Sequence, residues 1–503
     1  MWQFIVIIKF EKAYLCKPDV FKALMQFIRN SLMGQSDTVN VTICIYTDVQ
    51  PTLFLESLPS RLPQININSK YILFLNRNEG GHVIWDEKQV FHATLSGTSI
   101  PVSFSPYQPI ADLLRPQELG SLFKKLKPEH RQDKTLLFLL DHGSGFAIFG
   151  EPDFNPTLVP KSVSNNVSLI DTQIRKLNYY DFGENDVNIT ERFLNADEIE
   201  NRNQFNKSLA SYSESTDPVI FFKDVVVEPL NLTMDELAQA LDIAKFNPDV
   251  LVLANCFMFC IDTLYALKNS AKILISSSTA ITYEIFDIGS ILKSLPGKDI
   301  YEASLLFIDT AKNSPTLWKP DDTIEIKELV KERIALYAFD LTLMNQHNFW
   351  ATVHDCIQLI IELFSKDQEK KLLIVEAASM ARFNVLINYS LKYFFIDFFK
   401  FFFRVQYETQ HLFLQENAFD KLNTFKTIFG FNTNSQFIGS IVSDSNYSCG
   451  GPSIMFPFGK NDFDCRFIRI YYNGSGENPY RNSFCRDYNW DYFLYLWFSF
   501  KKD

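Results

Sequence analysis

Short apolar stretches recur along the chain, and nearly every position within each stretch is apolar. Strands that are buried on both faces have this pattern, as in a parallel sheet that helices cover on either side. We expect such strands at Phe4–Ile8, Val41–Tyr46, Tyr71–Leu75, Thr135–Leu140, Val219–Phe222, Val250–Ala254 and Ile273–Ile275.

Helical patterns alternate with these strands. Pro116 opens one of them, at a position where its missing N–H group costs nothing. Thr233 and Glu236 have the spacing of a capping box ahead of another. After about residue 327 the pattern is mostly helical, with an apolar stripe at Val353, Cys356, Ile357, Ile360, Ile361 and Phe364. This order predicts an α/β fold, with a mostly parallel sheet flanked by helices and a helical, aromatic-rich C-terminal part.

Changes in the pattern divide the chain into three parts. The segment at 155–216 is polar, has no sustained period, and predicts a long surface insertion. We expect a core at 1–312 that contains this insertion, a helical region at 313–430, and a C-terminal region at 431–503 that packs back on the core.

Composition narrows the class of protein. Of the 503 residues, 47% are hydrophobic and 21% are charged, which is typical of a globular chain. The net charge of −11, with no basic stripe, argues against a nucleic-acid partner. Charged residues interrupt the most membrane-like stretch, Leu391–Val405, which predicts a core or interface helix and no membrane span. The chain begins in an apolar run without a basic leader, so we expect a cytoplasmic location.

The eight cysteines are scattered and form no paired C-x-x-C units. We therefore expect no zinc site and, without a secretory leader, no disulfide framework. Cys256 and Cys260 lie four residues apart, and the ordinary interpretation of both is a small buried hydrophobic residue.

Two predicted strands end in reactive residues. Thr135–Leu140 leads into Asp141, His142 and Gly143, and Val250–Ala254 leads into Cys256. Because parallel neighbours end at the same edge of a sheet, His142 and Cys256 are predicted to meet there. An imidazole can take the proton of a thiol and so activate it, and the glycine lets the backbone approach a substrate. Either residue alone has an ordinary explanation, as a loop histidine or a packed cysteine.

The sequences around these two residues extend the pairing into longer motifs. An apolar strand is followed by Asp141–Phe146 (DHGSGF). Further along, Leu232–Leu237 (LTMDEL) precedes a strand and then Ala254–Met258 (ANCFM). In these blocks the chain resembles the clostripain family of cysteine peptidases, in the same clan as caspases and gingipains. Weaker similarity continues to Gly451–Pro457 (GPSIMFP), so the resemblance spans nearly the whole chain and implies a caspase-like fold.

The resemblance implies a role for each residue of the site. Cys256 attacks the peptide carbonyl, and His142 protonates the leaving amine. The N–H groups of Gly143 and Cys256 hold the oxyanion. No cofactor is implied; some family members depend on calcium, but the sequence identifies no calcium site. Caspase-like enzymes often carry a processed linker between the two blocks, so the 155–216 segment is either a zymogen linker or a passive insertion.

The chain also departs from the family pattern. The family has an aspartate two residues before the cysteine, where this chain has Ala254, and Asn255 replaces a small residue. Members often cleave after basic residues through acidic groups in the primary pocket. The resemblance places Ser277 among the substrate-binding residues, and Glu284 or Asp287 would have to supply the missing charge.

The sequence therefore predicts a cysteine endopeptidase that cuts an intracellular protein or peptide by limited proteolysis, with cleavage after basic residues as a further expectation. One alternative is a catalytically inactive caspase-like scaffold that binds a protein partner. A nucleotide-binding α/β protein is a weaker alternative, because the chain lacks the G-x-x-x-x-G-K-[ST] loop. The oligomeric state stays open.

Overall fold

The structure is a computed structural model of the chain. It describes residues 1–10, 23–24, 26–28, 30–31, 36, 38–47, 71–76, 90–94, 103–107, 115–128, 130, 132–141, 143, 145, 147–148, 192–193, 232–279, 281, 285–312, 335–345, 348–366, 395–409, 418–429, 439–442, 451–456, 482–490, 493 and 501–502.

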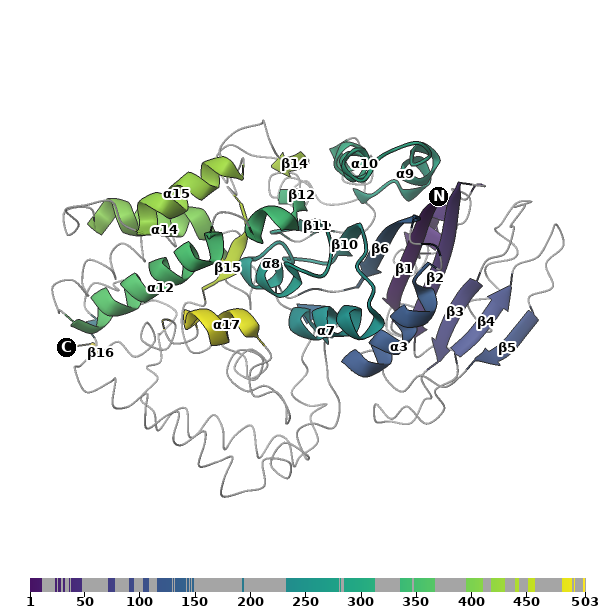
Figure 1. Cartoon of the computed structure of the whole chain (residues 1–503), viewed down its shortest axis with the longest axis horizontal. Helices are drawn as coiled ribbons and strands as arrows, with labels where there is room; N and C mark the ends of the chain where they lie inside the picture. Colours follow the sequence, from purple (N-terminus) through teal and green to yellow (C-terminus); the bar gives the residue numbers. More distant parts are fainter. Residues whose placement is uncertain are drawn as a thin grey trace, which may run out of the picture.

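A ten-stranded sheet runs through the centre of the described residues (Figure 1). Its order is β14-β12-β11-β10-β6-β1-β2-β3-β4-β5. The bounds are β1 Trp2–Phe10, β2 Val39–Thr47, β3 Tyr71–Asn76, β4 Val90–Thr94, β5 Ser103–Tyr107, β6 Lys134–Leu140, β10 Val250–Ala254, β11 Ile273–Ser277, β12 Ala335–Asp340 and β14 Gly439–Val442.

The six strands from β11 to β3 in this order are parallel to one another, and the antiparallel strands lie at the two edges of the sheet. The apolar stretches of the sequence became the central strands, as the pattern predicted. In the register, Leu140 of β6 pairs with Ile8 of β1 on one side and with Ala254 of β10 on the other. The carboxyl ends of β6 and β10 are therefore level, β1 runs two residues further to Phe10, and the residues that follow β6 and β10 lie at one edge.

Two helical layers cover the sheet and bury separate apolar clusters. On one face, α3 (Pro116–Leu126), α7 (Met234–Ala244) and α8 (Ile261–Leu267) pack against the odd-numbered side chains of β1, such as Ile5 and Ile7. On the other face, α9 (Ile288–Ser294) and α10 (Ile300–Lys312) pack against the even-numbered ones, such as Phe4 and Val6. Figure 1 shows α9 and α10 across the sheet from α3 and α7.

Helix α7 begins with the capping box that the sequence predicted. The hydroxyl of Thr233 accepts from the N–H of Glu236 at 3.3 Å, and the carboxylate of Glu236 accepts from the N–H of Thr233 at 2.9 Å. This pair satisfies two of the N–H groups that a helix start leaves without an intrahelical partner. The helix start is thereby fixed directly after β9 (Leu232–Thr233), which pairs with β7 (Ala147–Ile148).

The C-terminal part is rich in packed aromatic rings. Its elements are η7 Leu341–Asn345, α12 Phe349–Lys366, β13 Phe395–Asp397, α14 Phe398–Thr409, α15 Ala418–Ile428, β15 Ser453–Met455 and α17 Ser483–Tyr488. Figure 1 shows α12, α14 and α15 gathered beside the β12–β14 edge of the sheet. Phe349 of α12 has ring contacts with Phe399, Phe425 and Phe429, at centroid distances of 6.4, 5.3 and 5.0 Å. The predicted division into three parts stays a prediction, although β12 and β14 continue the sheet of the first part.

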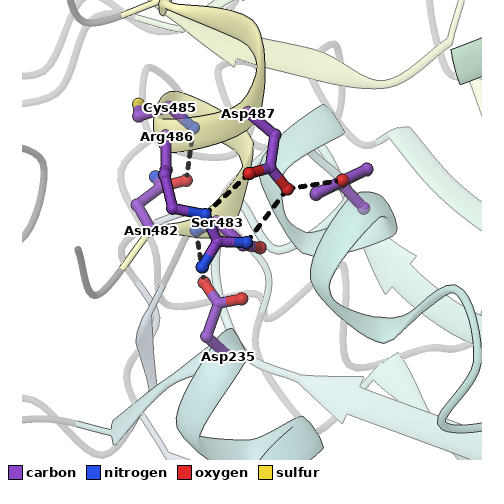
Figure 2. Close-up of polar contacts among 7 residues, drawn as sticks. Asp235, Asn482, Ser483, Cys485, Arg486 and Asp487 are labelled. Carbon is purple, nitrogen blue, oxygen red and sulfur yellow. Dashed lines mark hydrogen bonds and ion pairs between the residues drawn. The ribbon is translucent and has the colours of Figure 1, made fainter. Parts of the chain in front are cut away.

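Hydrogen bonds connect α17 and the residue before it to α7 and α8, the helices before and after β10 in the sequence. Figure 2 shows the contacts around α17. The Asn482 side chain caps α17 by accepting from the N–H of Cys485 at 3.1 Å, and it donates to the buried Asp262 of α8 at 2.9 Å. The N–H of Ser483 donates to Asp235 in the first turn of α7 at 2.9 Å. These contacts tie residues near the C-terminus to both helices that flank β10 in the sequence.

Most sequence predictions that fall on described residues are confirmed, with bounds that shift by a few residues. The predicted strand Val219–Phe222 lies outside the described residues, as does the 155–216 segment except for β8 (Arg192–Phe193), which pairs with β16 (Lys501–Lys502). The stretch Leu391–Val405 is in part a strand, β13, before it becomes helix α14. Among the described helices, none is long and apolar enough to cross a membrane.

Candidate active site

Cys256 lies on a sharp turn directly after β10, at the carboxyl edge of the sheet, and is half-buried. The next residue, Phe257, has a φ of 65°, in the left-handed region, which costs about 1 kcal/mol for a residue other than glycine. Two contacts hold this conformation. The N–H of Phe257 donates to the carbonyl of Thr279 at 3.1 Å, and its ring stacks on Phe395 at a centroid distance of 5.4 Å. The turn is therefore fixed by the end of β11 and by β13.

Gly143, near the end of β6, lies in backbone contact with this turn. A Cβ atom on Gly143 would lie 2.5 Å from the carbonyl oxygen of Cys256 and 3.0 Å from its nitrogen. It would also lie 2.8 Å from the Cβ of Asn255. Since Cβ atoms do not approach other atoms below about 3.0 Å, only glycine fits here without displacement. The two segments that the sequence predicted to meet do come together at this point.

Gly145 fixes the same loop against the start of α8. Its φ is 89°, and a Cβ there would overlap the ring of Phe395. Its carbonyl accepts from the thiol of Cys260 and from the hydroxyl of Thr263, the latter at 2.9 Å. The loop after β6 is therefore held on both sides, by backbone contact at Gly143 and by hydrogen bonds at Gly145.

A row of buried polar side chains lies beneath the turn. One position beyond the Ile8, Leu140 and Ala254 row of the register stand Lys9, the second-last residue of β1, and Asp141 and Asn255, which directly follow β6 and β10. The Lys9 ammonium is 4.0 Å from the Asp141 carboxylate, with side chains 7% and 1% exposed. The fully buried Asn255 side chain donates to the backbone carbonyl of Asp141 at 2.8 Å. These contacts join all three strand ends directly below Cys256.

The surroundings of Cys256 favour its protonated thiol. Burial raises the pKa of this thiol above its usual value, and the negative charge of Asp141 raises the pKa further. The thiol lies 3.3 Å from the carbonyl of Ile281 and donates to it, a hydrogen bond that only the protonated form can make. Both the burial and the charge of Asp141 therefore disfavour the thiolate.

The other described cysteines are more deeply buried than Cys256. Cys44, Cys260, Cys356 and Cys485 are all fully buried. Burial raises the pKa of Cys44 to about 12, and it also raises the pKa of Cys260 and Cys356. A buried thiol with a raised pKa is inert toward external reagents. Of the two cysteines four residues apart, Cys256 is thus the more exposed.

The remaining residues predicted from the sequence fall into two groups. His142 and Glu284 lie outside the described residues, so their roles stay predictions. Ser277 and Asp287 are described. Ser277 is fully buried at the end of β11, and its hydroxyl donates to the carbonyl of Ala335 at 3.0 Å. Asp287 is exposed and caps α9, with its carboxylate accepting from both the N–H and the hydroxyl of Ser290.

The structure brings Lys9 and Asn255 into the site, and the sequence analysis assigned neither of them a role there. The signal was present, because a lysine directly after the apolar run Phe4–Ile8 is unusual in a buried parallel strand. Only the strand order, which places β1 next to β6, reveals its partner. Across the ranges that the structure describes, no group of three or more His, Cys, Asp or Glu side chains is arranged to hold a metal ion.

No protein-family model and no curated protein matches this chain. Solved structures do match, over most of the chain. One is a secreted C11 cysteine protease from Bacteroides thetaiotaomicron called iotapain, at 10% identity and a TM-score of 0.43, covering 91% of this chain and 92% of that one. Another is an inactive zymogen C11 protease from Parabacteroides distasonis, at 12% identity and a TM-score of 0.45, covering 94% and 96%.

A third match is a secreted C11 protease from Bacteroides thetaiotaomicron in complex with an irreversible peptide inhibitor, at 9% identity and a TM-score of 0.42, covering 98% and 99%. C11 is the clostripain family, which the sequence motifs resemble. Because the TM-scores are all below 0.5, any function for this chain has to rest on the geometry of its own residues.

Proposed function

We propose that the chain is a cysteine endopeptidase of the clostripain type, with Cys256 as nucleophile and His142 as its acid–base partner. The observation that carries this proposal is the backbone contact between Gly143 and the turn at Cys256. His142 lies between Asp141 and Gly143 in the sequence, and both of these residues contact the residues that follow β10. The carbonyl of Asp141 accepts a hydrogen bond from Asn255, and Gly143 lies against the backbone of Cys256. A half-buried thiol at this edge of a parallel sheet is in the place where such folds carry chemistry.

The thiol environment determines what the partner must do. Because burial and the charge of Asp141 favour the protonated thiol of Cys256, His142 has to accept its proton before the sulfur can attack. The thiolate then adds to the peptide carbonyl, and the oxyanion lies near the N–H groups of Gly143 and Cys256. When the C–N bond breaks, the imidazolium returns its proton to the leaving amine, and a thioester remains. Water hydrolyses that thioester and restores the thiol.

The substrate we propose is a peptide segment of an intracellular protein, cut in a limited way. A preference for basic residues before the scissile bond rests on Glu284 or Asp287. Asp287 already serves as a helix cap, so Glu284 is the better choice for a charge-reversal variant. A peptide library with equal cleavage after basic and apolar residues would rule out this preference and leave the peptidase assignment intact.

The test of the proposal uses the full chain with a fluorogenic peptide library and a thiol-reactive peptide ketone. The wild type is expected to hydrolyse peptides and to form one adduct, mapped by mass spectrometry to Cys256. Cys256→Ala should lose both, and His142→Ala should lose about 10²- to 10⁴-fold in hydrolysis, the usual contribution of an acid–base group.

Cys260→Ser is the matched control, because a hydroxyl there can still donate to the Gly145 carbonyl while the sulfur is lost. It should keep hydrolysis and labelling. An adduct on Cys260, or hydrolysis that survives in Cys256→Ala, would show that the nucleophile is wrongly assigned. Labelling or partner binding without any hydrolysis would favour an inactive scaffold.

A further inference from the structure

The buried row beneath the turn contains an ion pair that the catalytic roles proposed above do not use. Lys9 and Asp141 continue the apolar row of Ile7 on β1 and Leu139 on β6, in which the neighbouring side chains are fully buried. Two residues further along, on the same face, stand the ammonium of Lys9 and the carboxylate of Asp141. They are 4.0 Å apart and almost without exposure to solvent.

Such a pair is expensive to bury. Desolvation of two charges commonly costs as much as their attraction returns, and apolar residues of the same volume often give an equally stable core. The fold of β1 and β6 therefore does not require the pair, since the strands are already held by their ladder and by two apolar clusters. Its placement one residue before the predicted acid–base residue suggests a role in the site.

The carboxylate of Asp141 acts on the Cys256 thiol from the end of the neighbouring strand. A negative charge there opposes formation of the thiolate that the reaction needs. The ammonium of Lys9 lies on the far side of that carboxylate, on β1. A cation beside the carboxylate reduces the field that the thiol experiences, because opposite charges at this distance nearly cancel at longer range.

We propose that Lys9 is a positioning residue of the Cys256 site. Its ammonium holds the Asp141 carboxylate at the end of β6 and offsets the negative charge that this carboxylate presents to the thiol. The catalytic consequence rests on the proposed peptidase function, whereas the effect on the thiol itself does not.

Within the described residues, charged side chains act on the thiol from two neighbouring elements. Asp141 acts from the end of β6 and Lys9 from the end of β1. From the β11 side, the contacts to the turn are the backbone carbonyls of Ile281 and Thr279. His142 follows Asp141 in the sequence and lies outside the described residues, so every variant below keeps it.

The experiment measures the rate of Cys256 alkylation by iodoacetamide as a function of pH on the substrate-free chain, with mass spectrometry to follow the Cys256 peptide. Lys9→Met removes the cation, and Lys9→Gln removes it but keeps a hydrogen-bond donor for Asp141. Both should move the alkylation midpoint up by about one pH unit, the scale on which neighbouring charges act. Below the midpoint, alkylation should then be about tenfold slower.

Two further variants separate charge from packing. In Lys9→Met/Asp141→Asn both charges are gone, and the midpoint should return close to that of the wild type. Lys272→Met is the matched control: it breaks another lysine–aspartate pair, with Asp249, at the opposite, amino-terminal edge of the sheet. It should leave the midpoint unchanged. In a peptidase assay, Lys9→Gln should lose kcat/KM at neutral pH and recover it as the pH rises, which a purely structural defect would not do.

The proposal is overturned if Lys9→Gln folds and has the wild-type midpoint, or if the double variant stays shifted like Lys9→Met. Should Lys9→Met fail to fold, Lys9→Gln and the double variant decide, since neither leaves a buried carboxylate next to an apolar side chain. Alkylation requires no peptidase activity. If the Lys9 variants shift the alkylation midpoint but the chain cuts no peptide, the proposed function alone is contradicted. If the chain is an active peptidase but the midpoint does not shift, this inference alone is contradicted.

Discussion

Gly143→Ala is expected to disable the site without unfolding the protein. The new Cβ would lie 2.5 Å from the carbonyl oxygen of Cys256, whereas ordinary contact begins at 3.4 Å. The end of β6 and the turn after β10 must then separate by close to 1 Å, because two of the three close neighbours of the new atom are backbone atoms and the third is the Cβ of Asn255, which is fixed to the backbone. A displacement of about 1 Å in reacting groups costs about 10²-fold in rate. We expect kcat/KM to fall by that factor, which corresponds to about 2.7 kcal/mol in transition-state binding.

The measurement is hydrolysis of the best peptide from the library, together with urea unfolding of each variant. Gly289→Ala is the matched control: it adds the same methyl group at the second residue of α9, where the Cβ would make an ordinary contact of 3.6 Å with Asn30. It should keep both activity and stability. Gly143→Ala should retain a cooperative unfolding transition, since the sheet and both apolar clusters are unchanged.

Wild-type activity in a fully folded Gly143→Ala variant would refute this reasoning. It would show that the loop after β6 can move away from the turn without cost, and that the close approach is not what sets the geometry of the site. Equal losses in both glycine variants would instead point to a general effect of added methyl groups.

Three other outcomes can be measured. Asn482→Ala removes the cap of α17 and a partner of the buried Asp262, so the free energy of unfolding should fall by about 2 kcal/mol, whereas an unchanged value would show that α17 is not anchored by this side chain. The folded pKa of Cys44, about 12, lies above the unfolded value, so unfolding releases a proton above about pH 8.5 and stability falls as pH rises; Cys44→Ala should reduce that slope by about 1.4 kcal/mol per pH unit, and an equal slope in both proteins would contradict the assignment. If the 155–216 segment is an activation linker, the wild type should be cut within it as activity rises, as seen on a denaturing gel, while Cys256→Ala stays intact; full activity of the uncut chain would exclude this role.

The sequence predicts the centre of the fold well, because buried parallel strands have a simple signature. The runs at Phe4–Ile8 and Thr135–Leu140 are apolar at nearly every position, since both faces of the sheet are covered, and they became β1 and β6. The antiparallel strands at the edges were harder to find. Edge strand β14 is only the four residues Gly439–Val442 and has no apolar run, so its pairing with β12 comes from the tertiary structure alone.

The site was predicted in part, and the missed part has a physical explanation. Strand ends and the residues that follow them can be recognised from local sequence, which is how Cys256 and Gly143 became candidates for the site. The order of strands in a sheet is a long-range property, and β1 lies next to β6 although more than a hundred residues separate them. The partnership of Lys9 with Asp141 depends on that order, so composition and motif spacing could not reveal it.

The aromatic C-terminal part has a physical connection to the site as well. The left-handed turn at Phe257 is strained, and its ring is held by stacking on Phe395, which belongs to β13. Strand β13 pairs with β15, and the N–H of Ser453 in β15 donates to the carbonyl of Phe259 at 2.9 Å. The hydroxyl of Ser278 joins the same carbonyl and that of Gly451, at 3.1 and 3.2 Å. Residues up to nearly two hundred positions later in the chain thus support the turn, so the position of Cys256 depends on β13 and β15 as well as on the parallel sheet.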